Sequence, residues 1–132
     1  MYDIYYAHHQ WKYHTREEEY ELDLIRKYFP NATIFNPSTD LDMKIVVYGN
    51  LVMRECLKAV DSSDIVIFSS VNGVISSDVY QEIMHAREKE KPCFYLYYDK
   101  LQPIFKVAKL VDEERSERLY AIIMPEVNFN DK

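Results

Sequence analysis

Glycine is almost absent from this sequence of 132 residues. The chain contains only Gly49 and Gly73, and neither belongs to a GxGxxG or Walker-type motif. Such motifs depend on glycine because the backbone must approach the phosphates of the ligand closely. The sequence therefore argues against dinucleotide binding of the GxGxxG kind and against P-loop chemistry.

Cysteine and clustered positive charge are also scarce. Cys56 and Cys93 stand alone, without the spacing of metal ligands, which predicts reduced and packed thiols. The formal net charge is −6, and no run of Lys or Arg stands out. Binding to a nucleic acid backbone is therefore not expected, because it depends on clustered basic side chains.

Long apolar segments are missing as well. No stretch approaches the roughly 20 residues that a membrane helix needs, and residues 1–3 do not begin a basic and then apolar leader. We therefore expect a cytoplasmic protein without a membrane segment. The length fits a single domain, and the composition, 48% hydrophobic and 29% charged, is that of a globular protein.

Short apolar runs alternate with segments long enough for helices. The sequence predicts strands at 3–7, 32–35, 64–68, 93–97 and 120–124. It predicts helices from the Thr15 capping box to about 29, from 40–43 to about 60, from Ser76 or Ser77 to about 89, and at 111–118. Residues 44–49 fit a strand equally well but are assigned to the second helix, and 99–103 are expected to form a turn.

This alternation predicts an α/β fold for the whole chain, 1–132. We expect one Rossmann-like, doubly wound domain with a mostly parallel sheet of about five strands and helices on both faces. Ligands of such sheets bind outside the carboxyl ends of the strands. Those ends are the segments 7–9, 36–38, 69–77 and 97–99, which should form one rim.

Glu82 lies on the expected helix after the central strand, three residues after Val79 and four before Ala86. It thus falls on or beside the face that packs on the sheet, near the helix N-terminus. A partly desolvated, ionised carboxylate there would suit a nucleophile or an acid/base group. The spacing alone favours the structural alternative, a glutamate that reaches water or pairs with Arg87 or Lys89.

Four groups of residues form a scattered but familiar pattern over about 3–98. They are Ile4-Tyr5-Tyr6-Ala7, Asn36-Pro37-Ser38, Ser63-Asp64-Ile65-Val66-Ile67, and Glu82 followed by Ala86 and Lys91-Pro92. This pattern resembles the nucleoside 2-deoxyribosyltransferase-like family. That family includes transferases that exchange bases on deoxynucleosides and hydrolases that release the base from deoxynucleoside monophosphates.

The resemblance implies that Glu82 attacks the anomeric carbon and that Tyr5 positions both Glu82 and the sugar. The reaction would be a retaining displacement at C1′, with an oxocarbenium-like transition state and a transient sugar ester. It also implies a homodimer or larger homo-oligomer in which neighbouring subunits complete the site. No cofactor is expected.

The chain departs from the family pattern at three places. His8 and His9 stand where the family has a glycine-containing turn, and the segment 76–78 replaces a glycine-rich approach to the nucleophile. Cys56 aligns with a second carboxylate that assists the leaving base. Asp40, Asp78 and His8 are alternatives for that role, and the sequence does not choose among them.

Seven residues near the expected rim are candidate substrate contacts: His8, Trp11, Asn36, Asp40, Ser76, Ser77 and Asp78. Trp11 is suited either to stack on a base or to cover the edge of the core. The serines are suited to bind a phosphate or to cap a helix, but Asp78 would repel a phosphate there. This favours a nucleoside, or a nucleotide whose phosphate lies elsewhere. The histidines lack metal-binding spacing, so no metal is expected.

Three functional classes are compatible with the sequence. The first is an enzyme that cleaves or transfers at the N-glycosidic bond of a (deoxy)nucleoside or nucleotide, with Glu82 as nucleophile. The second is a nucleotide-binding module that kept the rim and lost turnover. The third is an oligomeric interaction protein that uses some of the 12 tyrosines as contacts.

Overall fold

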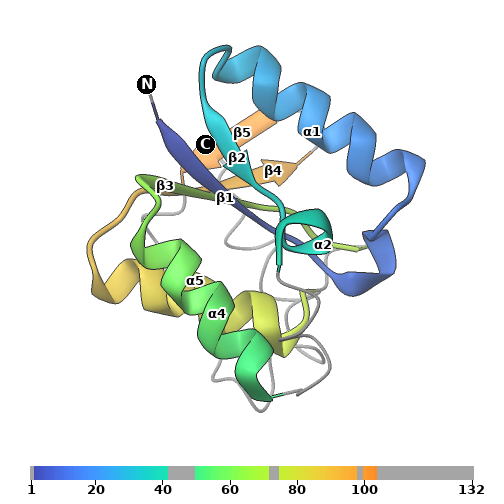
Figure 1. Cartoon of the computed structure of the whole chain (residues 1–132). Coiled ribbons are helices and arrows are strands. Elements are labelled where there is room, and N and C mark those ends of the chain that lie inside the picture. The colour runs from blue at the N-terminus through green and yellow to red at the C-terminus, as the bar shows by residue number, and fades with distance from the viewer. Residues whose placement is uncertain (1, 42–49, 72–74, 98–99, 104–132) are drawn as a thin grey trace.

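The computed structural model describes residues 2–41, 50–71, 75–97 and 100–103, which form an α/β fold with a mainly parallel sheet (Figure 1). Its elements in chain order are β1 (Asp3–Ala7), the 3-10 helix η1 (Gln10–Lys12), α1 (Arg16–Tyr28), β2 (Thr33–Phe35), α2 (Pro37–Asp40), α4 (Asn50–Asp61), β3 (Ile65–Phe68), α5 (Ser77–Glu88), β4 (Cys93–Tyr97) and β5 (Lys100–Pro103). None of the helices in these ranges combines the length and the apolarity needed to cross a membrane.

The sheet has the strand order β2-β1-β3-β4-β5. The first four of these strands are parallel, and β5 pairs with β4 in the antiparallel direction. In the register, Tyr5 of β1 stands between Phe35 of β2 and Val66 of β3. The chain order reverses between β1 and β3, so the crevice at their carboxyl ends is where a ligand of such a sheet is expected.

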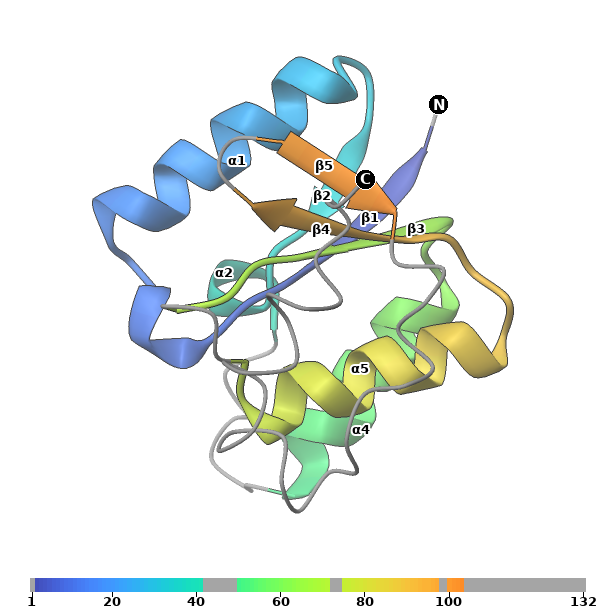
Figure 2. The ribbon, with the colours of Figure 1, turned by 180° about the vertical axis from the view of Figure 1, so that it is seen from behind.

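Side-chain alternation along β1 divides the core between the two faces of the sheet. Ile4 and Tyr6 pack with Ile25 of α1 on one face, whereas Tyr5 and Ala7 pack against α4 and α5 on the other. Figures 1 and 2 show α1 on one side of the sheet and α4 and α5 together on the opposite side. All four residues of β3 are buried, as a continuous apolar run predicts for a strand covered on both faces.

Most of the predicted boundaries are confirmed. β1 and β4 have the predicted bounds, and β2 and β3 each begin one residue later than predicted. Thr15 Oγ1 accepts the Glu18 N–H at 3.2 Å, and Ser76 Oγ accepts the Val79 N–H at 3.2 Å, so both helices begin at predicted caps. The loop expected after β1 contains η1. The predictions for 44–49, 111–118 and 120–124 lie outside the described residues.

The turn predicted at 99–103 is wrong for residues 100–103, which form β5. Tyr95 pairs with Gln102, and Leu96 pairs with Leu101. The prediction missed the strand because it is only four residues long and ends in Pro103. Proline is compatible with an outermost strand, since no ladder partner is needed on its open side.

Candidate active site

Tyr5 and Glu82 form a buried hydrogen-bonded pair between β1 and α5. The Tyr5 hydroxyl donates to Glu82 Oε2 at 2.7 Å, across 77 positions of sequence. The alternation of β1 directs Tyr5 toward α5, and Glu82 shares the buried face of α5 with Val79 and Ile83. The exposed fraction is 0% for Tyr5 and 5% for Glu82, so the pair is withdrawn from solvent.

The environment of Glu82 favours its protonated form. The pKa of Glu82 is raised to about 8: burial is the main cause and the charge of Asp78 adds to it, while the hydrogen bonds from Tyr5 and Cys56 lower it. In the sequence analysis, the functional alternative for Glu82 was a partly desolvated, ionised carboxylate. The carboxyl group is instead fully buried, and at pH 7 the neutral acid predominates, because α4 also covers this face of the sheet.

Cys56 of α4 lies beside the pair. The thiol is 4% exposed and shares a cluster with Tyr5. Burial, followed by the charge of Glu82, raises the pKa of Cys56 to about 12, so the thiol remains neutral. Burial also raises the pKa of Tyr5, with a further rise from Glu82, so its hydroxyl stays a donor. The residue that aligns with the family's second carboxylate therefore does contact the pair, but it is a poor proton donor.

Asp78, Ser76 and Ser77 lie at the start of the same helix. Ser76 is the N-cap of α5, and Ser77 is its first residue. Asp78 is exposed and lies one helical turn before Glu82, and its charge contributes to the raised pKa of Glu82. Of the predicted site residues, the structure thus brings Tyr5, Asp78 and Glu82 together, and Cys56 lies beside them.

His8 is held on the opposite face of the sheet. Its Nε2 lies 2.7 Å from Glu18 Oε2 and its Nδ1 lies 3.2 Å from the carbonyl oxygen of Tyr6, while the ring stacks on Tyr6 at 3.8 Å. Burial lowers the pKa of His8, and the bond to Glu18 partly offsets this. Both ring nitrogens are therefore occupied by protein atoms, and His8 is not directed toward Glu82.

Asn36, Asp40 and Trp11 also lie apart from the Tyr5–Glu82 pair. The Asn36 side chain accepts the Ser38 N–H at 3.0 Å and the Asn36 N–H donates to Asp40 Oδ2 at 2.7 Å, so the two residues cap α2. They also line a separate cavity of about 640 Å³ between α2 and the start of α1. Trp11 is 77% exposed and touches the ring of His9.

A second buried polar cluster was not predicted from the sequence. Lys12 Nζ donates to Glu21 Oε2 at 2.7 Å and to Ser69 Oγ at 3.0 Å, and Ser69 Oγ donates to Glu21 Oε1 at 2.7 Å. The Tyr6 hydroxyl also donates to Glu21. Lys12 is 3% exposed. We call Tyr6, Lys12, Glu21 and Ser69 the lysine cluster, which joins η1 and α1 to the ends of β1 and β3.

A sequence signal for the lysine cluster does exist. Glu18, Glu21 and Ile25 follow one another at helical spacing, so the two glutamates continue the buried stripe of α1 toward its N-terminus. A carboxylate on such a stripe requires a buried partner.

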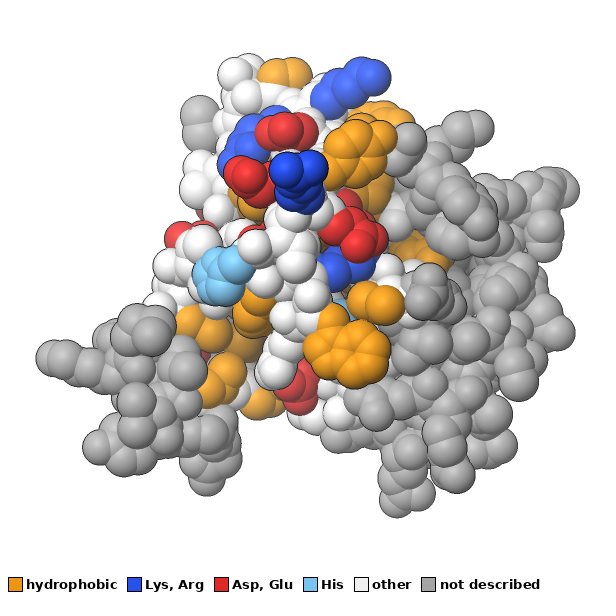
Figure 3. All heavy atoms as spheres, turned by 90° about the vertical axis from the view of Figure 1, so that its right-hand side faces the viewer, with side chains coloured by type: hydrophobic (Ala, Val, Ile, Leu, Met, Phe, Trp, Pro, Cys, Tyr) orange, Lys and Arg blue, Asp and Glu red, His pale blue; other side chains and the backbone are white. Residues whose placement is uncertain are grey.

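Figure 3 views the molecule from the side of η1 and the start of α1, where acidic and basic side chains lie close together. Within the described ranges, no three His, Cys, Asp or Glu side chains form a group that could hold a metal ion.

The buried carboxyl of Glu82 predicts a pH-dependent loss of stability. With a folded pKa of about 8 and an unfolded pKa near 4.5, the folded protein holds a proton that the unfolded chain releases. The free energy of unfolding therefore falls as pH rises from about 4.5 to 8, by about 1.4 kcal/mol per pH unit. We expect Glu82→Gln to remove this fall, measured by urea unfolding at pH 5 and pH 8.5. The exposed Glu88→Gln serves as control, and parallel curves for wild type and E82Q would contradict the expectation.

Removal of the Lys12 charge from the lysine cluster should destabilise the folded protein. We expect Lys12→Met to lower the free energy of unfolding by about 3–5 kcal/mol, because it leaves the Glu21 carboxylate buried without a counter-charge. Lys12→Met combined with Glu21→Gln should recover much of that loss. Chemical denaturation of the single and double variants measures both effects, with the exposed Lys27→Met as control. Additive losses in the double variant would show that the two charges do not depend on each other.

No family model matches the sequence, and no curated protein matches it either. The resemblance to the nucleoside 2-deoxyribosyltransferase-like family therefore rests on the short motifs quoted above. The contact between Tyr5 and Glu82 is the observation from which a function can be argued.

Proposed function

We propose that the protein cleaves or transfers at the N-glycosidic bond of a nucleoside or nucleotide, with Glu82 as nucleophile. The observation that carries this proposal is the buried 2.7 Å hydrogen bond from the Tyr5 hydroxyl to Glu82. A tyrosine on the first strand and a glutamate on the helix after the central strand are the pair that the resemblance implies. A structural glutamate would more often reach water, since unpaired carboxylates are rarely buried.

The strand order supports the Rossmann-like fold that this function needs. A parallel β2-β1-β3-β4 arrangement with helices on both faces fits a single Rossmann-like, doubly wound domain. Tyr5 belongs to β1, where the strand order reverses, and α5, which carries Glu82, follows β3. The reacting groups then lie beside the crevice in which such domains hold their ligands. A homodimer or larger homo-oligomer, as in the family, is part of the same proposal.

The proposed step is a displacement at C1′. An ionised Glu82 oxygen forms a bond to C1′ as the bond from C1′ to the base nitrogen breaks. The electron pair of the broken bond leaves with the base. The base takes up a proton from water, and the product is a sugar ester of Glu82. Water or a second base then attacks C1′ and releases the carboxylate, so the configuration at C1′ is retained.

Asp78 is the group best placed to hold a water molecule against the leaving base, and that water gives the base its proton. Asp78 lies one turn before Glu82 on α5, whereas His8 is bonded to Glu18 and Asp40 is bonded to the Asn36 N–H. The charge of Asp78 also disfavours a phosphate at the start of α5, which supports a nucleoside over a nucleotide seated there. The neutral Cys56 thiol favours the second candidate, a module that binds nucleosides without turnover.

Base release tests the proposed function directly. We expect wild-type protein to release free base from at least one member of a panel of deoxynucleosides and their monophosphates, followed by chromatography. Glu82→Gln keeps an acceptor for Tyr5 but is a poor nucleophile, so the rate should fall by at least about 100-fold. Glu88→Gln on the same helix should retain the wild-type rate. Stabilisation of the fold by nucleosides without any base release would select the binding module instead.

The pH profile should report the raised pKa of Glu82. Only the carboxylate is nucleophilic, and at pH 7 roughly a tenth of the molecules carry it if the pKa is about 8. We therefore expect kcat/KM to rise about tenfold per pH unit below pH 8 and to level off above it. Initial rates between pH 5 and pH 9.5 measure this. A profile that levels off near pH 5 would indicate that Glu82 is not the group whose ionisation limits the reaction.

A further inference from the structure

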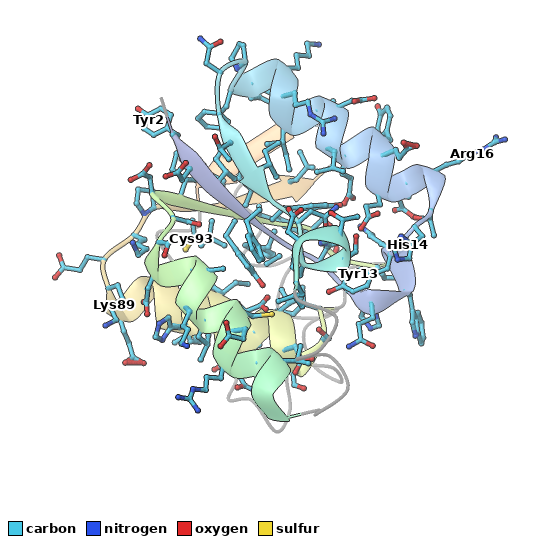
Figure 4. The ribbon with its side chains drawn as sticks, viewed as in Figure 1. Tyr2, Tyr13, His14, Arg16, Lys89 and Cys93 are labelled. Atoms are coloured by element: carbon cyan, nitrogen blue, oxygen red, sulfur yellow. The ribbon has the colours of Figure 1, made fainter. Side chains whose placement is uncertain are left out.

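The open edge of the sheet at β2 lacks the usual protection against further strand pairing. Among the described residues, β2 pairs only with β1, and Figures 1 and 4 show it in front of β1 with α1 on one flank and α4 on the other. Outermost strands often carry a charged residue or a proline, which oppose pairing with another chain. Residues 33–35 include neither, whereas β5, the outermost strand at the other side of the sheet, includes Lys100 and Pro103. The edge at β2 is therefore the one suited to accept another strand.

Ile34 is the residue of β2 whose backbone N–H and C=O point away from the sheet. The Thr33 N–H donates to the Tyr2 carbonyl at 2.9 Å, so the backbone of Thr33 faces β1. Successive residues of a strand direct their backbone groups to opposite sides. Ile34 therefore presents one donor and one acceptor to whatever lies beside the edge.

This edge is hollowed on both of its faces. On the α1 side, Ile34 lines the cavity of about 640 Å³ between α2 and the start of α1. On the α4 side, Ile34 and Phe35 line a second cavity of about 500 Å³, which Ala59 of α4 also borders. Ile34 and Phe35 are only half-buried, although they pack against opposite halves of the core. A strand placed beside β2 directs its alternate side chains toward the two cavities.

Exposed acidic side chains lie at one end of this edge, next to α2. Glu19 of α1 and Asp40 of α2 line the α1-side cavity there. Arg16 lines the same cavity, but Figure 4 shows its side chain pointing away from α2. The α2 end therefore presents an excess of negative charge to a neighbour.

Exposed basic side chains lie at the other end of the edge. Only residues 29–32 separate α1 from β2, so Arg26 and Lys27 in the last turn of α1 lie near the start of β2, about 10 Å along the helix from Glu19. Arg26 is bonded to Asp23 at 3.1 Å, and Lys27 adds a further positive charge. A second copy placed antiparallel to the first brings its basic end to the acidic end of the first. The edge is thus complementary to itself.

We propose that the open edge of β2 joins two copies of this chain, with Ile34 opposite Ile34 of the partner subunit in an antiparallel pair. Each Ile34 N–H donates to the Ile34 C=O of the other copy, so both outward-pointing groups are satisfied. Thr33 then lies opposite Phe35 of the partner subunit. The walls of the two cavities add contact area to a strand of only three residues. This inference rests on the homo-oligomer of the proposed function and adds its surface and register, and it does not depend on the reaction at Glu82.

Cysteine cross-linking tests the register. Opposed Cα atoms in a hydrogen-bonded antiparallel pair are about 5.5 Å apart, which is within the span of a disulfide. We expect Ile34→Cys to form a disulfide-linked dimer on oxidation with diamide, detected by non-reducing gel electrophoresis. Thr33→Cys is the matched control, because its two copies are offset by two positions along the strands and lie roughly 8 Å apart. The native Cys56 and Cys93 are buried and should not cross-link.

Light scattering after gel filtration, over a range of protein concentrations, tests the dimer itself. Ile34→Pro removes the outward N–H without removing a bond to β1, so we expect it to raise the Kd of a wild-type dimer at least about tenfold. Arg26→Glu should raise the Kd by a similar factor, since it brings like charges together. Lys89→Glu is the control, because Lys89 lies at the end of α5, away from β2 (Figure 4). Urea unfolding shows whether each variant is folded.

Each outcome decides the interface separately from the reaction. A monomeric wild type, or a dimer that persists in Ile34→Pro while Ile34→Cys does not cross-link, overturns the interface at β2. Equal cross-linking of Ile34→Cys and Thr33→Cys overturns the register, because random collision has that effect. If Ile34→Pro does not fold, the cross-linking and Arg26→Glu decide. Base release is assayed in parallel, so a monomer that releases base overturns the interface and leaves the proposed reaction standing, whereas a β2-linked dimer without base release does the reverse.

Discussion

A carboxyl group without a basic partner lies in the core of this protein, and its burial constrains the structure around it. Glu82 meets a tyrosine hydroxyl and a thiol, both neutral, rather than a lysine or an arginine. A charge in such surroundings is costly, so the group retains its proton to unusually high pH. The same surroundings make the ionised form reactive once it is produced. Burial of Glu82 therefore makes its charged form costly and also makes that form reactive.

The opposite face of the sheet also contains a buried carboxyl group, which is stabilised in another way. There Glu21 is also buried, but Lys12 provides a full positive charge and Tyr6 and Ser69 add donors. Every partner is satisfied, which is the condition under which a buried ion pair is tolerated. One face thus stabilises its carboxylate by a counter-ion and the other by protonation. A completed ion pair is suited to hold backbone segments in place, and a protonated acid is suited to react.

Much of the architecture could be predicted because it depends on local patterns. The apolar run at Ile65–Phe68, the Thr15 capping box and the Ser76 cap each identify an element from a few neighbouring residues. Helical spacing placed Glu82 on or beside the face of α5 that packs on the sheet, but by itself it favoured a glutamate that reaches water. Its partner did not follow from spacing, since a contact over 77 positions depends on how β1 and α5 pack, and Tyr5 was proposed only through a resemblance. The Lys12–Glu21 pair was missed because polar residues at a helix start usually indicate solvent exposure.

The adjacent tyrosines of β1 carry a further consequence for how this chain can vary. Tyr5 and Tyr6 are neighbours in sequence, yet one serves the Glu82 side of the sheet and the other the Glu21 side. A one-residue insertion or deletion inside β1 would exchange the faces of both side chains at once. One tyrosine would then take the place of the other, so one carboxyl group would keep a phenol partner and the other would lose it. The length of this strand therefore determines which of the two buried carboxyl groups has a phenol to bond.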